Sequence, residues 1–353
     1  MATSADLRVA VIGYSLAGEV FHAPLVATTP GMRLVGVVTG NAERAQRVRD
    51  RYGDVHVFPT AARLWERARD LDLVVVASPN STHVPLALDA LAAGLSVVVD
   101  KPFAASAADA RRVVDEAGRR GLLLTVFQNR RWDGDFLTVR RLVEDGRLGT
   151  ITRFESRFER WRPTPRIGWR ESSEPADAGG VLFDLGPHLI DQALQLFGPA
   201  TAVYAELDRR RPHVVVDDDV FVALVHECGV RSHLWMSAVA PQAGPRFRLL
   251  GSQAGYTKFG LDPQEAMLKD GARPGDPGYG EDPENVWGVV VDGEGRTARV
   301  RTIPGSYRTF YEGVAAALRT GTAPPVDPLD AVAGLEIIES CRRMTARTEH
   351  LSS

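Results

Sequence analysis

The segment LRVAVIGYSLAG, which runs from Leu7 to Gly18, decides the fold. Its first six residues, Leu7–Ile12, form an almost continuously apolar run that is typical of a strand buried on both faces of a sheet. The turn Gly13–Gly18 follows directly and opens a helix, whose N-terminus would point backbone N–H groups at an anion. Dinucleotide-binding turns of this kind are rich in glycine, and Ser15 stands where their second glycine is usual. The turn predicts dinucleotide binding because it follows the first strand of a series of strand–helix units, which are described next.

Strand and helix patterns alternate from Leu7 to Phe127. This alternation predicts βαβ units, in which a parallel sheet is covered by helices. Pro24 lies inside the first helical pattern, and we expect it to interrupt or kink that helix. The predicted strands are Leu7–Ile12, Arg33–Thr39, Leu73–Ala77, Leu95–Asp100 and Leu122–Phe127, and the predicted helices are Ala17–Thr28, Ala42–Tyr52, Val84–Ala93 and Ala107–Arg120.

The pattern changes after Trp132. One helix, Phe136–Asp145, is followed by strand patterns that arrive without helices between them, which favours a mostly antiparallel sheet. The Gly-, Pro- and Asp-rich stretch Asp262–Asp282 is predicted as a long loop. The predicted strands are Ile151–Trp161, Ala202–Leu207, Val220–His226, Arg231–Met236 and Arg246–Leu250, and the final predicted helices are Ser306–Arg319 and Asp330–Thr345.

The chain of 353 residues fits two domains, since a domain commonly has about 100–200 residues. We predict an α/β protein whose N-terminal Rossmann domain, a doubly wound parallel sheet, occupies residues 1–128. A C-terminal α+β domain with a large, mostly antiparallel sheet is predicted over residues 129–353, for substrate binding and oligomerisation. The final helices, within residues 306–345, are expected to pack back near the Rossmann domain.

Composition argues against several classes of protein. A net charge of −3, from 42 basic and 45 acidic residues, disfavours binding to nucleic acid or to a membrane surface. Two cysteines, Cys228 and Cys341, are too few for a disulfide framework or a thiolate metal site, and the scattered histidines lack the spacing of metal ligands. The N-terminus has no signal-peptide pattern, and the longest apolar runs are too short to span a bilayer. We therefore expect a cytoplasmic protein.

Two groups of polar residues follow predicted strands at the place where an open α/β sheet binds its ligand. They are Ser78–His83 and Asp100–Pro102. Elsewhere, Asp184 and His188 are four residues apart, so on a helix they would share one face, although Pro187 either begins or kinks that helix. Both residues are candidates for catalysis. The alternative roles are a helix cap for Asp184 and a hydrogen-bonded core position for His188.

The end of the second predicted strand bears on the choice of cofactor. An Asp or Glu at this place usually binds the ribose 2′-hydroxyl of NAD, and none is present in Val38–Asn41. The missing carboxylate removes a source of repulsion toward the 2′-phosphate of NADP, which Thr39, Asn41 and Arg44 could contact. NADP is therefore slightly favoured over NAD, although Arg44 could equally be a surface charge.

Several motifs resemble signatures of the Gfo/Idh/MocA oxidoreductases, the family of glucose–fructose oxidoreductase and inositol dehydrogenase, and the resemblance covers essentially the whole chain. The family motifs are Gly13–Gly18, Phe21-His22-Ala23-Pro24, Pro79-Asn80-Ser81-Thr82-His83, Asp100-Lys101-Pro102, Asn129-Arg130-Arg131-Trp132-Asp133 and Asp184-Leu185-Gly186-Pro187-His188. The runs that resemble more narrowly the branch containing NADP-dependent scyllo-inositol dehydrogenase are Phe21–Pro24, Asn129–Asp133, Phe136-Leu137-Thr138, Trp169-Arg170-Glu171 and Gly260–Glu265.

The resemblance implies a catalytic set and a cofactor site. A lysine before proline, an aspartate and a histidine four residues later match Lys101, Asp184 and His188, which would also bind substrate together with Tyr256. The expected cofactor contacts are Gly13, Tyr14, Ser15, Leu16, Ala17, Thr39, Asn41, Arg44, Ser78, Pro79, Asn80, His83, Asp100, Lys101, Pro102, Gln128, Asn129, Trp169 and Arg170. The departures from the family pattern are Ser15 for Gly, Asp100 for Glu, Phe183 for Tyr, and Gly40-Asn41 for Ser-Arg.

The function implied is NAD(P)-dependent hydride transfer between nicotinamide and a secondary alcohol or ketone of a polyol or sugar, either inositol-like or aldose-like. His188 suits the proton acceptor, because a neutral imidazole can take a proton near neutral pH. Lys101 would donate to the forming alkoxide, and Asp184 would orient the reacting groups. Two alternatives stay open: an NAD-dependent glycoside hydrolase of the same fold, and a non-catalytic NADP-binding regulatory protein.

The predicted C-terminal sheet also bears on assembly. Its strands span roughly residues 151–250, and the helices predicted after it can cover one face, which leaves an apolar surface larger than monomers usually expose. A second copy of the chain is the simplest cover. We therefore expect a homodimer or homotetramer built on this sheet.

Overall fold

The computed structural model describes residues 5–165 and 168–349 and divides into two compact units. The first unit comprises residues 1–129, 264–279 and 306–332, and the second comprises residues 130–263, 280–305 and 333–353. The predicted domain boundaries, with the final helices packing back near the Rossmann domain, stay a prediction.

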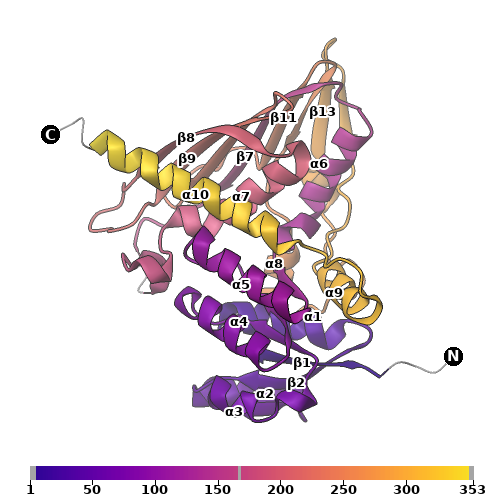
Figure 1. Ribbon diagram of the computed structural model, residues 1–353. Coiled ribbons are helices and arrows are strands. Elements are labelled where there is room, and N and C mark those ends of the chain that lie inside the picture. The colour runs from indigo at the N-terminus through magenta and orange to yellow at the C-terminus, as the bar shows by residue number, and fades with distance from the viewer. Residues whose placement is uncertain (1–4, 166–167, 350–353) are drawn as a thin grey trace. The chain divides into compact units, whose positions relative to one another are not determined.

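The first unit is built on a six-stranded parallel sheet in the order β3-β2-β1-β4-β5-β6 (Figure 1). The chain moves outward from β1 to β3 and then returns to the other side of β1, so the strand order reverses between β1 and β4. All residues of β4 and β5, mostly valines, are buried, as the continuous apolar runs predicted. The strands are β1 (Leu7–Ile12), β2 (Met32–Val38), β3 (His56–Phe58), β4 (Leu73–Val76), β5 (Ser96–Val99) and β6 (Leu124–Val126).

Local capping explains where two helices of the first unit begin and end. α2 (Ala42–Tyr52) starts where Asn41 Oδ1 accepts a hydrogen bond from the N–H of Arg44, at 2.9 Å. α5 (Ala107–Arg120) is capped in the same way by Ser106 and stops at Gly121, whose φ is +64°. The other helices of this unit are α1 (Ala23–Thr28), α3 (Ala61–Trp65), α4 (His83–Ala92), α8 (Gln264–Lys269) and α9 (Arg308–Thr320).

The helix after the glycine turn is irregular, as the proline predicted. Residues 17–22 form a π-helical turn, in which the N–H of Ala23 donates to the carbonyl of Gly18. An α-helix, α1, then begins with Pro24 in its first turn, where the missing N–H of proline has no helical partner to lose. The wider turn places His22 in a fully buried position, which matters below.

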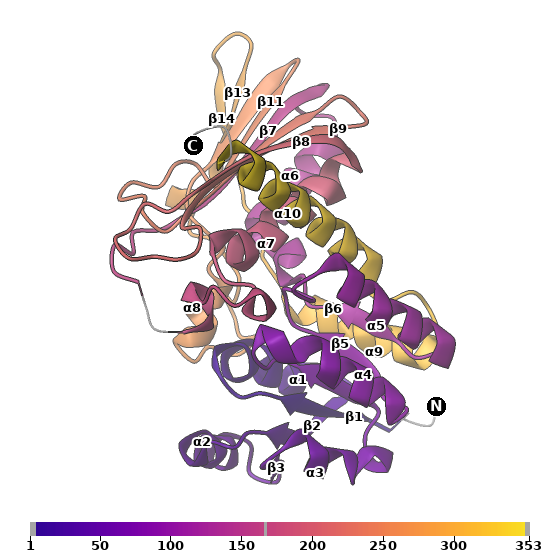
Figure 2. The same cartoon turned by 60° about the vertical axis from the view of Figure 1, so that its left-hand side comes forward.

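The second unit contains an eight-stranded sheet in the order β14-β13-β12-β11-β7-β10-β9-β8. All neighbouring strands are antiparallel apart from the pair β7 and β10, so the sheet is mostly antiparallel as predicted. α7 (Val181–Phe197) packs on β7, β9 and β10, and both ribbon views show it lying along the sheet (Figure 2). The remaining elements are α6 (Gly134–Glu144), α10 (Pro328–Glu349), β7 (Ile151–Glu159), β8 (Ala200–Asp208), β9 (Asp219–His226), β10 (Arg231–Ser237), β11 (Phe247–Gly251), β12 (Ala254–Lys258), β13 (Gly288–Asp292) and β14 (Thr297–Val300).

Some local predictions were wrong. The expected loop Asp262–Asp282 contains α8, whose residues Gln264–Lys269 are good helix formers between flanking prolines and glycines. Pro187 does not begin α7 but lies inside it, so Asp184 and His188 do share one helix. The sequence analysis also did not predict the strands β3, β12, β13 and β14 or the helix α3.

Candidate functional site

The predicted cofactor contacts of the first unit gather at the carboxyl edge of its parallel sheet. The turns after β1, β2, β4, β5 and β6 all leave this edge, because all six strands run in the same direction. The strand order reverses between β1 and β4, and an open α/β sheet binds its ligand at such a point. The sequence therefore places these turns where a dinucleotide would bind.

Two glycines make the turn after β1 compact. Gly13 has φ +98°, and a Cβ on it would lie 2.5 Å from the carbonyl oxygen of Ala77 at the end of β4. A Cβ on Gly18 would collide with the carbonyl oxygen of Gly13. Neither position can take a side chain unless the backbone moves, so the turn keeps the compact glycine geometry of a dinucleotide-binding turn although Ser15 replaces one glycine.

The side chains of this turn differ in exposure. Tyr14 is 1% exposed, so it can offer a ligand its backbone and not its ring. Leu16 is 46% exposed, and Ser15 and Ala17 are half-buried. Ser15 can therefore present its hydroxyl to a ligand.

The residues expected to read the cofactor ribose come together after β2. The hydroxyl oxygen of Thr39 accepts from the N–H of Asn41 at 3.3 Å, and Asn41 caps the helix that carries Arg44. Asn41 therefore has a structural role, which does not exclude a contact with phosphate at the exposed helix N-terminus.

His83 ties two of the predicted turns together. Its ring nitrogens lie 2.9 Å from the carbonyl oxygens of Pro102 and Ser78, and its side chain is 1% exposed. Burial lowers the pKa of His83. This geometry favours a role in holding the turns after β4 and β5 in register.

Asp100 and Lys101 follow β5, with Asp100 Oδ1 accepting from the N–H of Lys101 at 2.9 Å. Burial opposes the ionisation of Asp100, but hydrogen bonding with the His22 ring and the nearby Lys101 ammonium outweigh it and lower the pKa of Asp100 below its ordinary value. Asp100 therefore offers a carboxylate that accepts hydrogen bonds. His22 is therefore a further functional candidate. It belongs to the Phe21–Pro24 motif, for which no role was predicted.

Gln128 and Asn129 follow β6 and are both buried. Oε1 of Gln128 has no hydrogen-bond partner within the described part of the chain. A buried acceptor of this kind normally has a partner, so a ligand group at this edge would satisfy it.

The second unit places Asp184 and His188 on one face of α7, with 8% and 4% exposed. The first turn of α7 is held by Asp217, whose Oδ2 accepts from the N–H of Leu182 at 2.7 Å. Asp217, and not Asp184, therefore takes the capping role that was an alternative for Asp184. Burial raises the pKa of Asp217.

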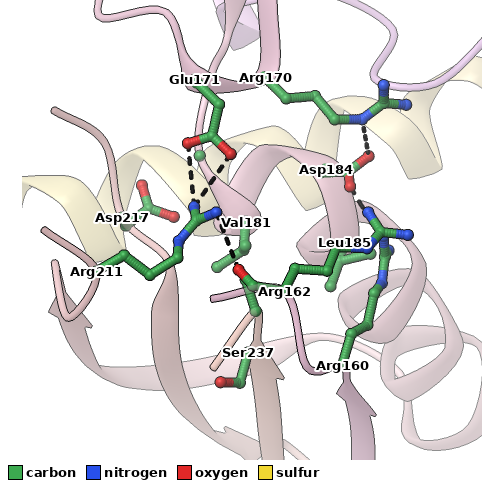
Figure 3. Close-up of a pocket in the computed structure, with 12 residues that line it drawn as sticks. Arg160, Arg162, Arg170, Glu171, Val181, Asp184, Leu185, Arg211, Asp217 and Ser237 are labelled. Carbon is green, nitrogen blue, oxygen red and sulfur yellow. Dashed lines mark hydrogen bonds and ion pairs between the residues drawn. The ribbon is translucent and has the colours of Figure 1, made fainter. Parts of the chain in front are cut away.

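Two arginines hold the Asp184 carboxylate. Arg170 Nε lies 3.1 Å from Oδ1, and Arg160 Nη2 lies 3.6 Å from Oδ2 (Figure 3). The Arg170 guanidinium also stacks 4.2 Å from the ring centre of Trp169. The two arginines come from different segments, so Asp184 is fixed from both sides.

A small pocket adjoins this carboxylate. Arg211 lies on its wall and makes ion pairs with Glu171 at 3.0 Å and with Asp218 at 2.8 Å. Charged side chains around it can supply hydrogen bonds to a polar ligand group. The complete lining is Arg160, Arg162, Arg170, Glu171, Gly180, Val181, Asp184, Leu185, Arg211, Asp217, Ser237 and Ala238.

The predicted site residues are thus distributed over both units. Lys101 belongs to the first unit, whereas Asp184, His188, Trp169 and Arg170 belong to the second. Tyr256 lies on β12 with 1% exposed and is absent from the lining of the pocket beside Asp184, so its role in substrate binding stays a prediction. The arginines at positions 160 and 211 were not predicted.

The part of the chain that the structure describes contains neither a cluster of metal-ligating side chains nor a membrane-spanning helix. Across residues 5–165 and 168–349, no group of three or more His, Cys, Asp or Glu side chains is arranged to hold a metal ion. No described helix is both long enough and apolar enough to cross a membrane.

Comparisons with known proteins agree with this geometry. Residues 7–128 match the model of an oxidoreductase family with an NAD-binding Rossmann fold, and residues 136–257 match the GFO/IDH/MocA C-terminal domain. The oxidoreductase YdgJ of Escherichia coli (strain K12) is 39% identical over 95% of both chains. The scyllo-inositol 2-dehydrogenase (NADP(+)) IolW of Bacillus subtilis (strain 168) is 33% identical over 95% of this chain and 92% of its own.

A solved structure also resembles this chain closely. The yvaA protein from Bacillus subtilis superposes with a TM-score of 0.92 at 30% identity, over 99% of this chain and 98% of its own. The matches cover both units and contain the cofactor and Asp184–His188 motifs. The chain therefore belongs to the Gfo/Idh/MocA family of NAD(P)-binding oxidoreductases.

Proposed function

We propose that this protein transfers a hydride between NAD(P) and a secondary alcohol or ketone of a polyol or sugar. The observation that carries the proposal is the buried pair Asp184 and His188 on one face of α7, with Asp184 on the wall of a polar pocket. The names of similar proteins support the substrate class, since they include a scyllo-inositol 2-dehydrogenase, a D-apiose dehydrogenase and a D-glucoside 3-dehydrogenase.

The cofactor fits the carboxyl edge of the parallel sheet. The turn after β1 would hold the pyrophosphate, and Asp100 would accept from a ribose hydroxyl. When bound, the nicotinamide supplies the hydride chemistry. We propose NADP as the preferred form, because the end of β2 has no carboxylate to repel a 2′-phosphate. A higher kcat/KM with NAD than with NADP would contradict this preference.

The chain's own residues would accept and donate the proton of the substrate hydroxyl. His188 takes the hydroxyl proton during alcohol oxidation and returns it during ketone reduction. Arg160 and Arg170 hold Asp184 as a fixed acceptor, which orients substrate hydroxyls and the neighbouring imidazole. The Lys101 ammonium donates to the oxygen as negative charge develops there.

The decisive experiment is a substrate screen. Inositols, aldoses and their oxidised forms are incubated with NAD and NADP, and the absorbance of reduced nicotinamide is followed. Net sugar release without cofactor turnover would indicate the glycoside hydrolase, and nucleotide binding without turnover of any substrate would indicate the regulatory protein.

Lys101→Ala tests the catalytic assignment. We expect turnover to fall roughly 100- to 1,000-fold while nucleotide still binds, as is typical when one donor to the transition state is lost. Lys269→Ala is the matched control, because Lys269 pairs with Glu265 on the surface of α8 and should leave turnover unchanged. Near wild-type turnover in Lys101→Ala would overturn the assignment.

A further inference from the structure

A buried series of three polar side chains lies behind the Asp100–Lys101 turn. Tyr311 Oη lies 2.6 Å from His22 Nδ1, and His22 Nε2 lies 3.5 Å from Asp100 Oδ1. His22 and Tyr311 are both fully buried, and all three residues belong to the first unit. His22 comes from the Phe21–Pro24 motif, to which the proposed mechanism gives no role.

The chemistry of the groups sets the direction of this series. A carboxylate only accepts hydrogen bonds, so the ring nitrogen that faces Asp100 must carry the proton. In a neutral imidazole the other nitrogen, Nδ1, is then an acceptor, and the Tyr311 hydroxyl must donate to it. Burial raises the pKa of Tyr311 well above its ordinary value, which keeps this hydroxyl protonated.

The gap between His22 and Asp100 is long for a hydrogen bond. Within the described residues, however, His22 Nε2 has no closer hydrogen-bond partner, and a buried N–H without a partner is costly. Hydrogen bonds in sites without ligand are often long and tighten when the ligand binds. Asp100 is therefore the acceptor that Nε2 can reach.

The contacts of Asp100 are one-sided. The N–H of Lys101 and the ring of His22 both address Oδ1. Since both donors face Oδ1, they restrict the rotation of the carboxylate, and Oδ2 is the oxygen that a ligand hydroxyl would reach. The His22 ring is itself held in place, since it packs 4.4 Å from the ring centre of Phe127 at the end of β6.

We propose that His22, oriented by Tyr311, is a positioning residue that aims Asp100 at the cofactor ribose. This inference rests on the proposed function, because it concerns the nicotinamide cofactor. The π-helical turn before α1 contributes by bringing His22 into the interior. The series also links α9 to the turn after β5, and His22 and Tyr311 are 289 positions apart in sequence.

The first test needs no cofactor. Nitrogen-15 NMR of the protein without nucleotide should show His22 as the neutral tautomer protonated at Nε2, and Tyr311→Phe should shift the ring toward a mixture of tautomers. A wild-type ring protonated at Nδ1 would overturn the inference. Tyr311→Phe keeps the aromatic packing on Phe127 and Phe310, so it is expected to fold.

The second test measures nucleotide affinity by fluorescence titration. We expect His22→Leu to raise the Kd about tenfold and Tyr311→Phe to raise it about threefold, because each loses a hydrogen bond that orients a charged group. His22→Gln should recover part of the affinity, since its amide can donate near the position of Nε2. Thr125→Val is the control, because it removes a buried hydrogen bond to Val326 of the same unit that lies outside the series.

A double-mutant cycle separates positioning from general destabilisation. In an Asp100→Asn background, Tyr311→Phe should no longer change the Kd, because the tyrosine acts through the carboxylate. Additive effects in the cycle would refute the inference even if His22→Leu did not fold. If the wild-type protein bound neither nucleotide, the proposed function would fail instead, so the two failures are distinguishable.

Discussion

Replacing Gly13 by alanine tests the glycine turn that underlies the cofactor assignment. The structure predicts two separate costs. The first is backbone strain, since φ is +98° and an L-residue at positive φ costs about 1–2 kcal/mol. The second is a collision, because the new Cβ would lie 2.5 Å from the Ala77 carbonyl oxygen, whereas ordinary contact begins at 3.4 Å.

The turn must therefore move by about 0.9 Å to accept alanine, the difference between those two distances. A forced shift of this kind in a packed interior costs about 1–3 kcal/mol more. We expect Gly13→Ala to lower the free energy of unfolding by about 2–5 kcal/mol in total. Because the moved backbone would carry the pyrophosphate contacts, the nucleotide Kd should also rise at least about tenfold.

Gly121→Ala is the matched control. Gly121 also has positive φ, at +64°, but a Cβ there meets nothing within 4 Å. It should therefore show the backbone cost alone, about 1–2 kcal/mol, with an unchanged nucleotide Kd. Urea unfolding measures the stability and fluorescence titration the affinity. If the two variants changed the free energy of unfolding and the nucleotide Kd equally, the reasoning about the glycine turn would be refuted.

Three further predictions concern the second unit. Arg170→Ala removes a cation that pairs with Asp184 and should lower kcat/KM roughly tenfold. Stability should change little, since the Arg170 side chain is 43% exposed. Steady-state kinetics that match the wild type would contradict this role of Arg170. Burial raises the pKa of Asp135 to about 6, above its unfolded value of 3.8, so its contribution to stability is present at low pH and is lost as the pH rises through 6. Urea unfolding from pH 4 to pH 7 should therefore show the wild type losing stability relative to Asp135→Asn. If the difference between the two free energies of unfolding stayed constant with pH, the prediction for Asp135 would be wrong. One face of the eight-stranded sheet carries Trp235 and Tyr204, which is 55% exposed, and we expect this face to pair with a second copy of the chain. Light scattering should then give a mass above the 38.4 kDa of one chain, and Tyr204→Glu should lower that mass.

Much of the fold follows from local sequence. The bounds of α2 and α5 were predicted residue for residue, because polar caps and following glycines mark their ends. The parallel sheet could be predicted because its buried strands are continuous apolar runs separated by helices. Short strands such as β3 escaped, since three residues carry no readable period.

The candidate site divides in the same way. Its turns could be placed from sequence because they directly follow strands, and the four-residue spacing of Asp184 and His188 put them on one helix face. The partners of these residues depend on contacts between distant segments. Arg160 reaches Asp184 from the end of β7, and Tyr311 reaches His22 across 289 positions. No local pattern encodes such pairs, because the packing of whole elements decides which distant side chains meet.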